Sequence, residues 1–157
     1  MKRVIVWPVF IGVMVVAIGA SASPVAKQRI AIEEKTTVSF AGTGTFRLIP
    51  LTPGPLRADS GSFTFFGGFR GITIRGGQEV KTYAGLDTLD GKRGTLRVKA
   101  TSTSTDSGFG YDGGGSTWSF VEGTGSYASL KGGGRGTIVS TPSGTVLSRY
   151  EGYVTVP

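Results

Sequence analysis

The chain has 157 residues, with 17 lysines and arginines against 10 acidic residues for a net charge of +7, and it contains no histidine and no cysteine. The missing residue types exclude Ser-His-Asp and Cys-His triads, disulfides, and zinc sites made of histidine or cysteine. The basic residues are scattered along the chain rather than gathered in one block, so a nucleic-acid partner is not indicated.

The beginning of the chain has the pattern of an export signal. Two basic residues precede an apolar run over residues 4–18, and the small residues Ala20-Ser21-Ala22 follow. The run is shorter than the roughly 20 apolar residues of a bilayer span. We expect a signal-peptide helix over residues 1–22, cleaved after Ala22, and one domain over residues 23–157 that is secreted or held in the cell envelope without stable membrane insertion. An uncleaved N-terminal anchor is the alternative.

After this leader, apolar residues recur at every second position and no segment keeps helical spacing. The segments expected to form strands are residues 30–40, 43–49, 62–66, 72–75, 79–84, 94–100, 116–122, 136–140 and 146–156. They follow one another at intervals of about 8–12 residues, which is typical of a sandwich or barrel. We therefore expect an all-β fold, a single antiparallel β-barrel of about eight strands, in which glycine permits bulges and sharp coiling.

Three stretches are expected to lie outside the strands. Residues 50–55 contain three prolines, residues 86–93 contain the turn-forming pair Asp-Gly, and residues 101–115 are rich in Ser, Thr and Gly. Turn chemistry is the simplest explanation for four aspartates in or beside these loops, since their spacing matches no calcium-binding loop. They are Asp87, Asp90, Asp106 and Asp112.

Two glutamates are the candidate catalytic residues. Glu34 shares a strand face with Ile30 and Ile32, and Glu122 is expected to share one with Trp118 and Phe120. If these faces line the interior of a barrel, burial would raise the carboxyl pKa values and suit both groups to general acid chemistry. The alternatives are a solvated bulge at Glu34, a rim position for Glu122 at the end of its strand, or buried pairing with an arginine.

Aromatic side chains are the candidate ligand-binding residues. Trp118, Phe120 and Tyr150 are expected inside the barrel, where they either fill the core or line a ligand cavity. Phe109 and Tyr111 stand at the tip of the 101–115 loop, where aromatics form a ligand lid or a binding surface, or fold over the barrel mouth.

The segment Gly123-Thr-Gly-Ser-Tyr127-Ala-Ser-Leu130-Lys-Gly132 resembles a segment of dirigent proteins and allene oxide cyclases. Together with Thr117-Trp118 and residues 91–96, it is also similar to small secreted bacterial proteins of unassigned function. The resemblance covers about residues 91–140 and implies an eight-stranded barrel with an apolar interior. Plant members of these families cyclise or steer small apolar molecules, but none of their catalytic residues can be placed on this chain by motif.

Three functions are consistent with these patterns. The favoured one is non-catalytic binding of a small apolar ligand or a cell-envelope partner, because no catalytic motif is present. The alternatives are a cofactor-free lyase, isomerase or cyclase with Glu122 or Glu34 as proton donor, and a structural envelope component. No metal and no cofactor is expected, and the sequence does not predict the oligomeric state.

Overall fold

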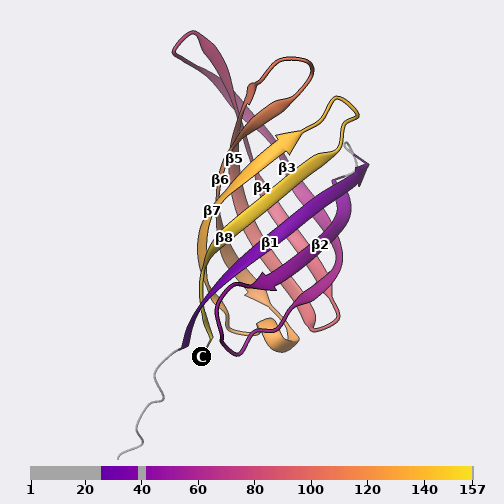
Figure 1. The fold of residues 1–157 in the computed structure, drawn as a ribbon, viewed down its shortest axis with the longest axis vertical. Coiled ribbons are helices and arrows are strands. Elements are labelled where there is room, and N and C mark those ends of the chain that lie inside the picture. Colours follow the sequence, from indigo (N-terminus) through magenta and orange to yellow (C-terminus); the bar gives the residue numbers. More distant parts are fainter. Residues whose placement is uncertain (1–25, 39–41, 157) are drawn as a thin grey trace, which may run out of the picture.

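The computed structural model describes residues 26–38 and 42–156, so the expected signal segment and Phe40 lie outside the described residues. The described residues form one antiparallel sheet of eight strands, which confirms the all-β expectation. The strands are β1 (Ala26–Val38), β2 (Thr43–Pro50), β3 (Asp59–Arg75), β4 (Gln78–Gly91), β5 (Gly94–Asp106), β6 (Asp112–Gly123), β7 (Lys131–Ser140) and β8 (Val146–Val156). Each strand pairs with the next, and β8 pairs with β1, so the sheet closes into a ring (Figure 1).

The ring has two ends of different character. At one end lie the β2–β3 connection, the β4–β5 turn and the 3-10 turn η1 (Gly125–Tyr127), and we call it the η1 end. At the other end, which we call the hairpin end, the β3–β4 and β5–β6 hairpins project well beyond the remaining strands (Figure 1). The β7–β8 turn lies at this end too. The two ends of the ring therefore present different surfaces.

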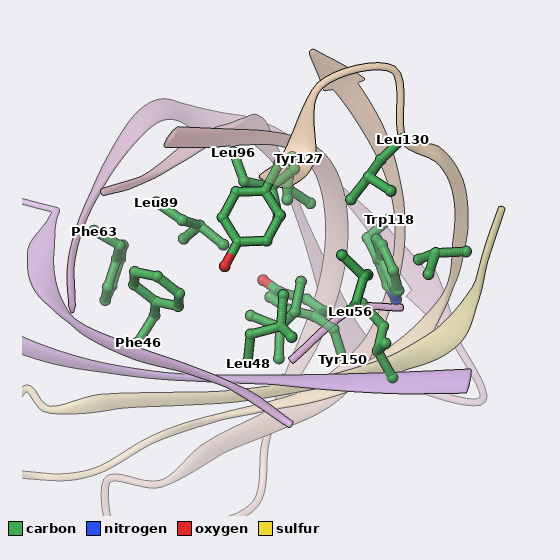
Figure 2. Close-up of a cluster of buried hydrophobic side chains, with 14 of the residues drawn as sticks. Phe46, Leu48, Leu56, Phe63, Leu89, Leu96, Trp118, Tyr127, Leu130 and Tyr150 are labelled. Atoms are coloured by element: carbon green, nitrogen blue, oxygen red, sulfur yellow. The ribbon is translucent and has the colours of Figure 1, made fainter. Parts of the chain in front are cut away.

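Apolar side chains fill the interior toward the η1 end (Figure 2). Alternate residues of each strand point into the ring, as the period of two in the sequence predicts. Leu96 and Val98 of β5, for example, are fully buried, whereas Lys99 is exposed. The labelled members of this core in Figure 2 are Phe46, Leu48, Leu56, Phe63, Leu89, Leu96, Trp118, Tyr127, Leu130 and Tyr150.

A buried carboxylate ties the η1 end together. The η1 turn places Tyr127 inside the ring, where its hydroxyl donates a hydrogen bond of 2.7 Å to Asp59 Oδ2. Asp59 also accepts hydrogen bonds from the backbone N–H groups of Ser60, Lys92 and Arg93, at 2.8–3.1 Å. One side chain thus joins β3, the β4–β5 turn and η1, and provides the acceptor for the buried Tyr127 hydroxyl and for three partly buried backbone N–H groups.

Several strands are longer than expected. Residues 62–66 and 72–75 belong to one strand, β3, which continues past Gly67 and Gly68 with a bulge between Phe69 and Gly71. Strand β4 runs through residues 86–91, and the turn there is Lys92-Arg93. Strand β5 extends to Asp106 and β6 begins at Asp112, so only five residues of the expected 101–115 loop are a loop. Pairing with a neighbouring strand supplies backbone hydrogen bonds, and this outweighs the local turn preference of Gly, Ser and Asp.

Candidate functional site

A cavity of about 380 Å³ occupies the interior toward the hairpin end. The apolar core does not reach this half of the ring, because several inward positions here carry small or polar residues in place of Leu, Ile and Phe. The lining includes Glu34, Phe63, Phe65, Tyr83, Asp87, Ala100, Ser102, Ser104, Ile138, Ser148 and Tyr150. Volumes of about 300–1,000 Å³ are typical of small-molecule sites.

Three carboxyl side chains line this cavity: Asp112, which pairs with Lys81 at 3.5 Å, and the buried Glu34 and Asp87. Glu34 follows Ile30 and Ile32 on the inner face of β1 and is 5% exposed. Asp87 precedes Leu89 on the inner face of β4 and is 2% exposed. One oxygen of each group, Glu34 Oε1 and Asp87 Oδ2, is buried without a hydrogen-bond partner among the described residues. Buried polar atoms in proteins nearly always have partners, so this pair needs an explanation.

Burial raises the pKa of both acids. It raises the pKa of Glu34 well above its ordinary value, and the nearby charge of Asp87 raises it further, while a hydrogen bond from Tyr150 acts in the opposite direction. Burial also raises the pKa of Asp87, to about 7. Near neutral pH the two groups therefore hold at least one proton, so one can donate a hydrogen bond while the other accepts one.

Tyr150 is the third polar group at this position. Strand β8 pairs with β1, with Tyr150 opposite Ile32 in the register, and the buried tyrosine hydroxyl hydrogen-bonds to Glu34. Burial, together with the charges of Glu34 and Asp87, raises the pKa of Tyr150, so its hydroxyl stays protonated. The ring packs against the backbone of Gly136, where a Cβ atom would lie 2.6 Å from Tyr150 Cδ1.

The rest of the lining divides into a hydroxyl side and an aromatic side. On β5, Ser102 and Ser104 face the cavity, and Ser102 hydrogen-bonds to Ser116 of β6 at 2.7 Å. On β3 and β4, the rings of Phe63, Phe65 and Tyr83 line the cavity. The site therefore offers mainly apolar contact area with a few polar groups gathered at Glu34, Asp87 and Tyr150.

The structure places Glu122 outside the cavity, and its expected shared face with Trp118 and Phe120 is corrected. In the β5–β6 register, Val98 lies opposite Phe120 while Arg97 lies opposite Glu122, so Val121 is an extra, bulged residue. The bulge reverses the alternation, and Glu122 is exposed and paired with Arg97. Glu122 thus has an arginine partner, but the pair is exposed and is not the buried arginine pairing left open as an alternative.

Three of the five expected ligand-binding aromatics lie together, with the Trp118 ring centroid 5.1 Å from that of Phe120 and 6.4 Å from that of Tyr150, but only Tyr150 lines the cavity. Tyr150 belongs both to the apolar core and to the cavity lining, whereas Trp118 belongs to the core alone, where its indole N–H donates to the Glu151 carbonyl at 3.3 Å. Phe120 packs against that core. Phe109 and Tyr111 lie in the β5–β6 loop and are exposed. Neither of them contributes to the lining of the cavity.

Asp87 is the buried site residue that sequence reasoning missed, and Asp112, also assigned to turn chemistry, lines the cavity too. Asp87 was explained by turn chemistry because it lies three residues before an Asp-Gly pair. The available signal was alternation: Asp87 and Leu89 occupy every second position, as Ile32 and Glu34 do on β1. An interpretation of residues 86–91 as a strand would have placed the Asp87 carboxylate on the same inner face as Leu89.

No family model, curated protein or solved structure matches the chain. The resemblance to dirigent proteins and allene oxide cyclases accordingly stays a prediction. Among the residues that the structure describes, no three carboxylates are grouped as a metal site would need. Within the same residues, no helix has the length and apolar character needed to cross a membrane.

Proposed function

We propose that the protein binds a small, mainly apolar molecule whose polar end donates hydrogen bonds to Glu34 and Asp87. The observation that carries this proposal is the pair of unpartnered carboxyl oxygens, Glu34 Oε1 and Asp87 Oδ2, beside a cavity of about 380 Å³. A buried polar atom without a partner typically costs about 1–3 kcal/mol, which a bound donor would recover.

The chemistry of the polar end follows from the protonation of the pair. Above about pH 7, Asp87 carries a negative charge in a site lined mostly by carbon. A carboxylate in such a site accepts hydrogen bonds and favours a cation, whereas a second anion would add like-charge repulsion. An alkyl amine in its protonated form fits best, an alcohol fits less well, and a fatty acid is excluded.

Three probes that share one octyl chain test this preference. At about pH 8, octylamine is expected to raise the melting temperature the most, octanol less, and octanoate not at all, because only the amine is both a cation and a donor. Differential scanning fluorimetry over a concentration series measures the shift. Equal stabilisation by all three probes, or none by octylamine, would contradict the proposal.

Two variants serve as controls for the same experiment. Glu34→Gln with Asp87→Asn keeps the shape of the site but removes its charge, so the preference for octylamine over octanol should disappear. Glu33→Gln removes a carboxylate from the outer face of the same strand, where Glu33 pairs with Arg149, and should leave the preference unchanged.

A second candidate function, cofactor-free acid–base catalysis, is favoured by one observation: burial raises the Asp87 pKa to about 7. An acid poised near the working pH is effective in general acid–base chemistry, as an isomerase or cyclase would need. The protein is then expected to accelerate exchange of the α-hydrogens of 2-octanone in D₂O, measured by NMR. The double variant should lose this exchange, and exchange no faster than in buffer would rule the activity out for this ketone.

A further inference from the structure

The hairpin end carries large apolar side chains that nothing in the described part of the chain covers. On β3, Phe69, Ile72 and Ile74 share one face of the projecting part of the β3–β4 hairpin and are 49–65% exposed, while Phe66 lies on its other face, opposite Leu86, and is 84% exposed. Such a cluster is costly in water, whereas single exposed apolar residues are ordinary. Its concentration on one projection points to a partner.

The apolar side chains on this hairpin are continuous with the cavity. In the register, Phe69 lies opposite Tyr83, Ile72 opposite Lys81 and Ile74 opposite Glu79, so these three apolar residues share the face of Tyr83. Tyr83 lines the cavity, and its ring meets that of Phe69 edge to face, with centroids 5.8 Å apart. A row of apolar side chains on β3 thus leads from the cavity toward the tip of the hairpin, with the charged Lys81 and Glu79 beside it on β4.

The second projection ends in another exposed aromatic residue. Phe109, between Gly108 and Gly110 in the β5–β6 loop, is 98% exposed and has a φ of 55°. A left-handed backbone is unfavourable for phenylalanine, and no burial within the described residues offsets that cost. Both hairpins extend from the same end of the ring (Figure 1).

The charges on the β3–β4 hairpin are mainly basic. Residues 66–83 contain Arg70, Arg75 and Lys81 against one acidic residue, Glu79, which gives a net charge of +2. Arg70 follows Phe69 and Arg75 follows Ile74, so cations stand next to the exposed apolar groups. This combination is typical of surfaces that enter the headgroup region of an anionic bilayer.

We propose that the β3–β4 hairpin and Phe109 dock the hairpin end on an anionic lipid surface, so that the cavity faces the bilayer. A second copy of the chain fits less well, because a symmetric dimer would place two basic hairpins against each other. The two separate projections also form no flat face. Docking rests on exposure and charge, and it does not require that the cavity bind the ligand proposed above.

Vesicle flotation tests the docking surface. At about 0.1 M salt, the purified protein is expected to float with phosphatidylcholine vesicles that contain about 30 mol% phosphatidylglycerol, and to float much less with pure phosphatidylcholine. Ile72→Ser with Ile74→Ser should lower the partition coefficient at least about tenfold, because two apolar side chains lose their burial in lipid. The matched control, Leu51→Ser with Tyr153→Ser, removes two exposed apolar side chains outside the hairpins and should bind as the parent protein does.

A charge-reversal variant provides an independent measurement. Arg70→Glu with Arg75→Glu leaves the apolar groups in place and should lower binding to the anionic vesicles by about tenfold or more. Failure of the parent protein to float, or equal losses in the hairpin and control variants, would overturn the proposal. So would a dimer in sedimentation that the Ile72→Ser/Ile74→Ser variant converts to monomer without any vesicle binding, because the occupant would then be a second copy.

Discussion

Replacing Glu34 with glutamine is expected to raise the free energy of unfolding at about pH 8, by about 1–3 kcal/mol. Glutamine has the shape of glutamate and still accepts the hydrogen bond from Tyr150, but it carries no charge that must be desolvated. Urea unfolding of the parent and the variant measures the difference. An acid whose removal stabilises the fold is retained for a reason other than stability.

The two buried cavity acids are expected to make the free energy of unfolding fall as the pH rises. Burial raises the folded-state pKa of Asp87 from 3.8 to about 7 and raises that of Glu34 well above its ordinary value. Between about pH 4 and pH 7 the folded protein therefore keeps protons that the unfolded chain has released, so stability falls as the pH rises through this window. The Glu34→Gln and Asp87→Asn double variant should show a flatter profile there.

The control for this prediction is Glu33→Gln. Glu33 lies beside Glu34 on the same strand but faces outward, where it pairs with Arg149. Partly exposed ion pairs contribute little, so its loss should change stability by less than about 1 kcal/mol and leave the pH profile intact. If Glu34→Gln destabilised the protein equally at about pH 5 and pH 8, the role of Glu34 would be to stabilise the fold and not to bind a ligand.

Replacing Asp59 with alanine is expected to have the opposite effect and to lower the free energy of unfolding by about 3–5 kcal/mol. The substitution leaves the buried hydroxyl of Tyr127 and three backbone N–H groups without their acceptor. Tyr127→Phe removes only one donor and should cost about 1–2 kcal/mol. Denaturant unfolding measures the loss in free energy of unfolding for both variants. A loss for Asp59→Ala no larger than that for Tyr127→Phe would contradict the role of Asp59 as an acceptor shared by several donors.

Asp59 also differs from the cavity acids in its pH dependence. Burial acts to raise its pKa, but the hydrogen bonds from Tyr127, Ser60, Arg93 and Lys92 together hold the pKa below its ordinary value of 3.8. Its contribution to stability is present above that ordinary value and is lost as the pH falls through the lower folded-state pKa. The chain thus uses one buried carboxylate for structure at the η1 end, and keeps two others that cost stability beside the cavity.

Much of this architecture could be predicted from residue order. The alternation of Ile30, Ile32 and Glu34 placed Glu34 on an inner face of the sheet. Alternation works because successive side chains of a strand must point to opposite faces, wherever the partner strands lie. The all-β fold class and the inward position of Glu34 both follow from this local rule.

The tertiary structure decided the rest. Asp87 faces the cavity because β4 stays paired with β3 and β5 through residues that favour a turn in isolation. Glu122 faces solvent because a single bulged residue, Val121, reverses the alternation before it. Both outcomes depend on register between strands, and register is set by closure of the whole ring. Local sequence determined which side chains alternate, and only pairing between distant segments decided which acids meet inside.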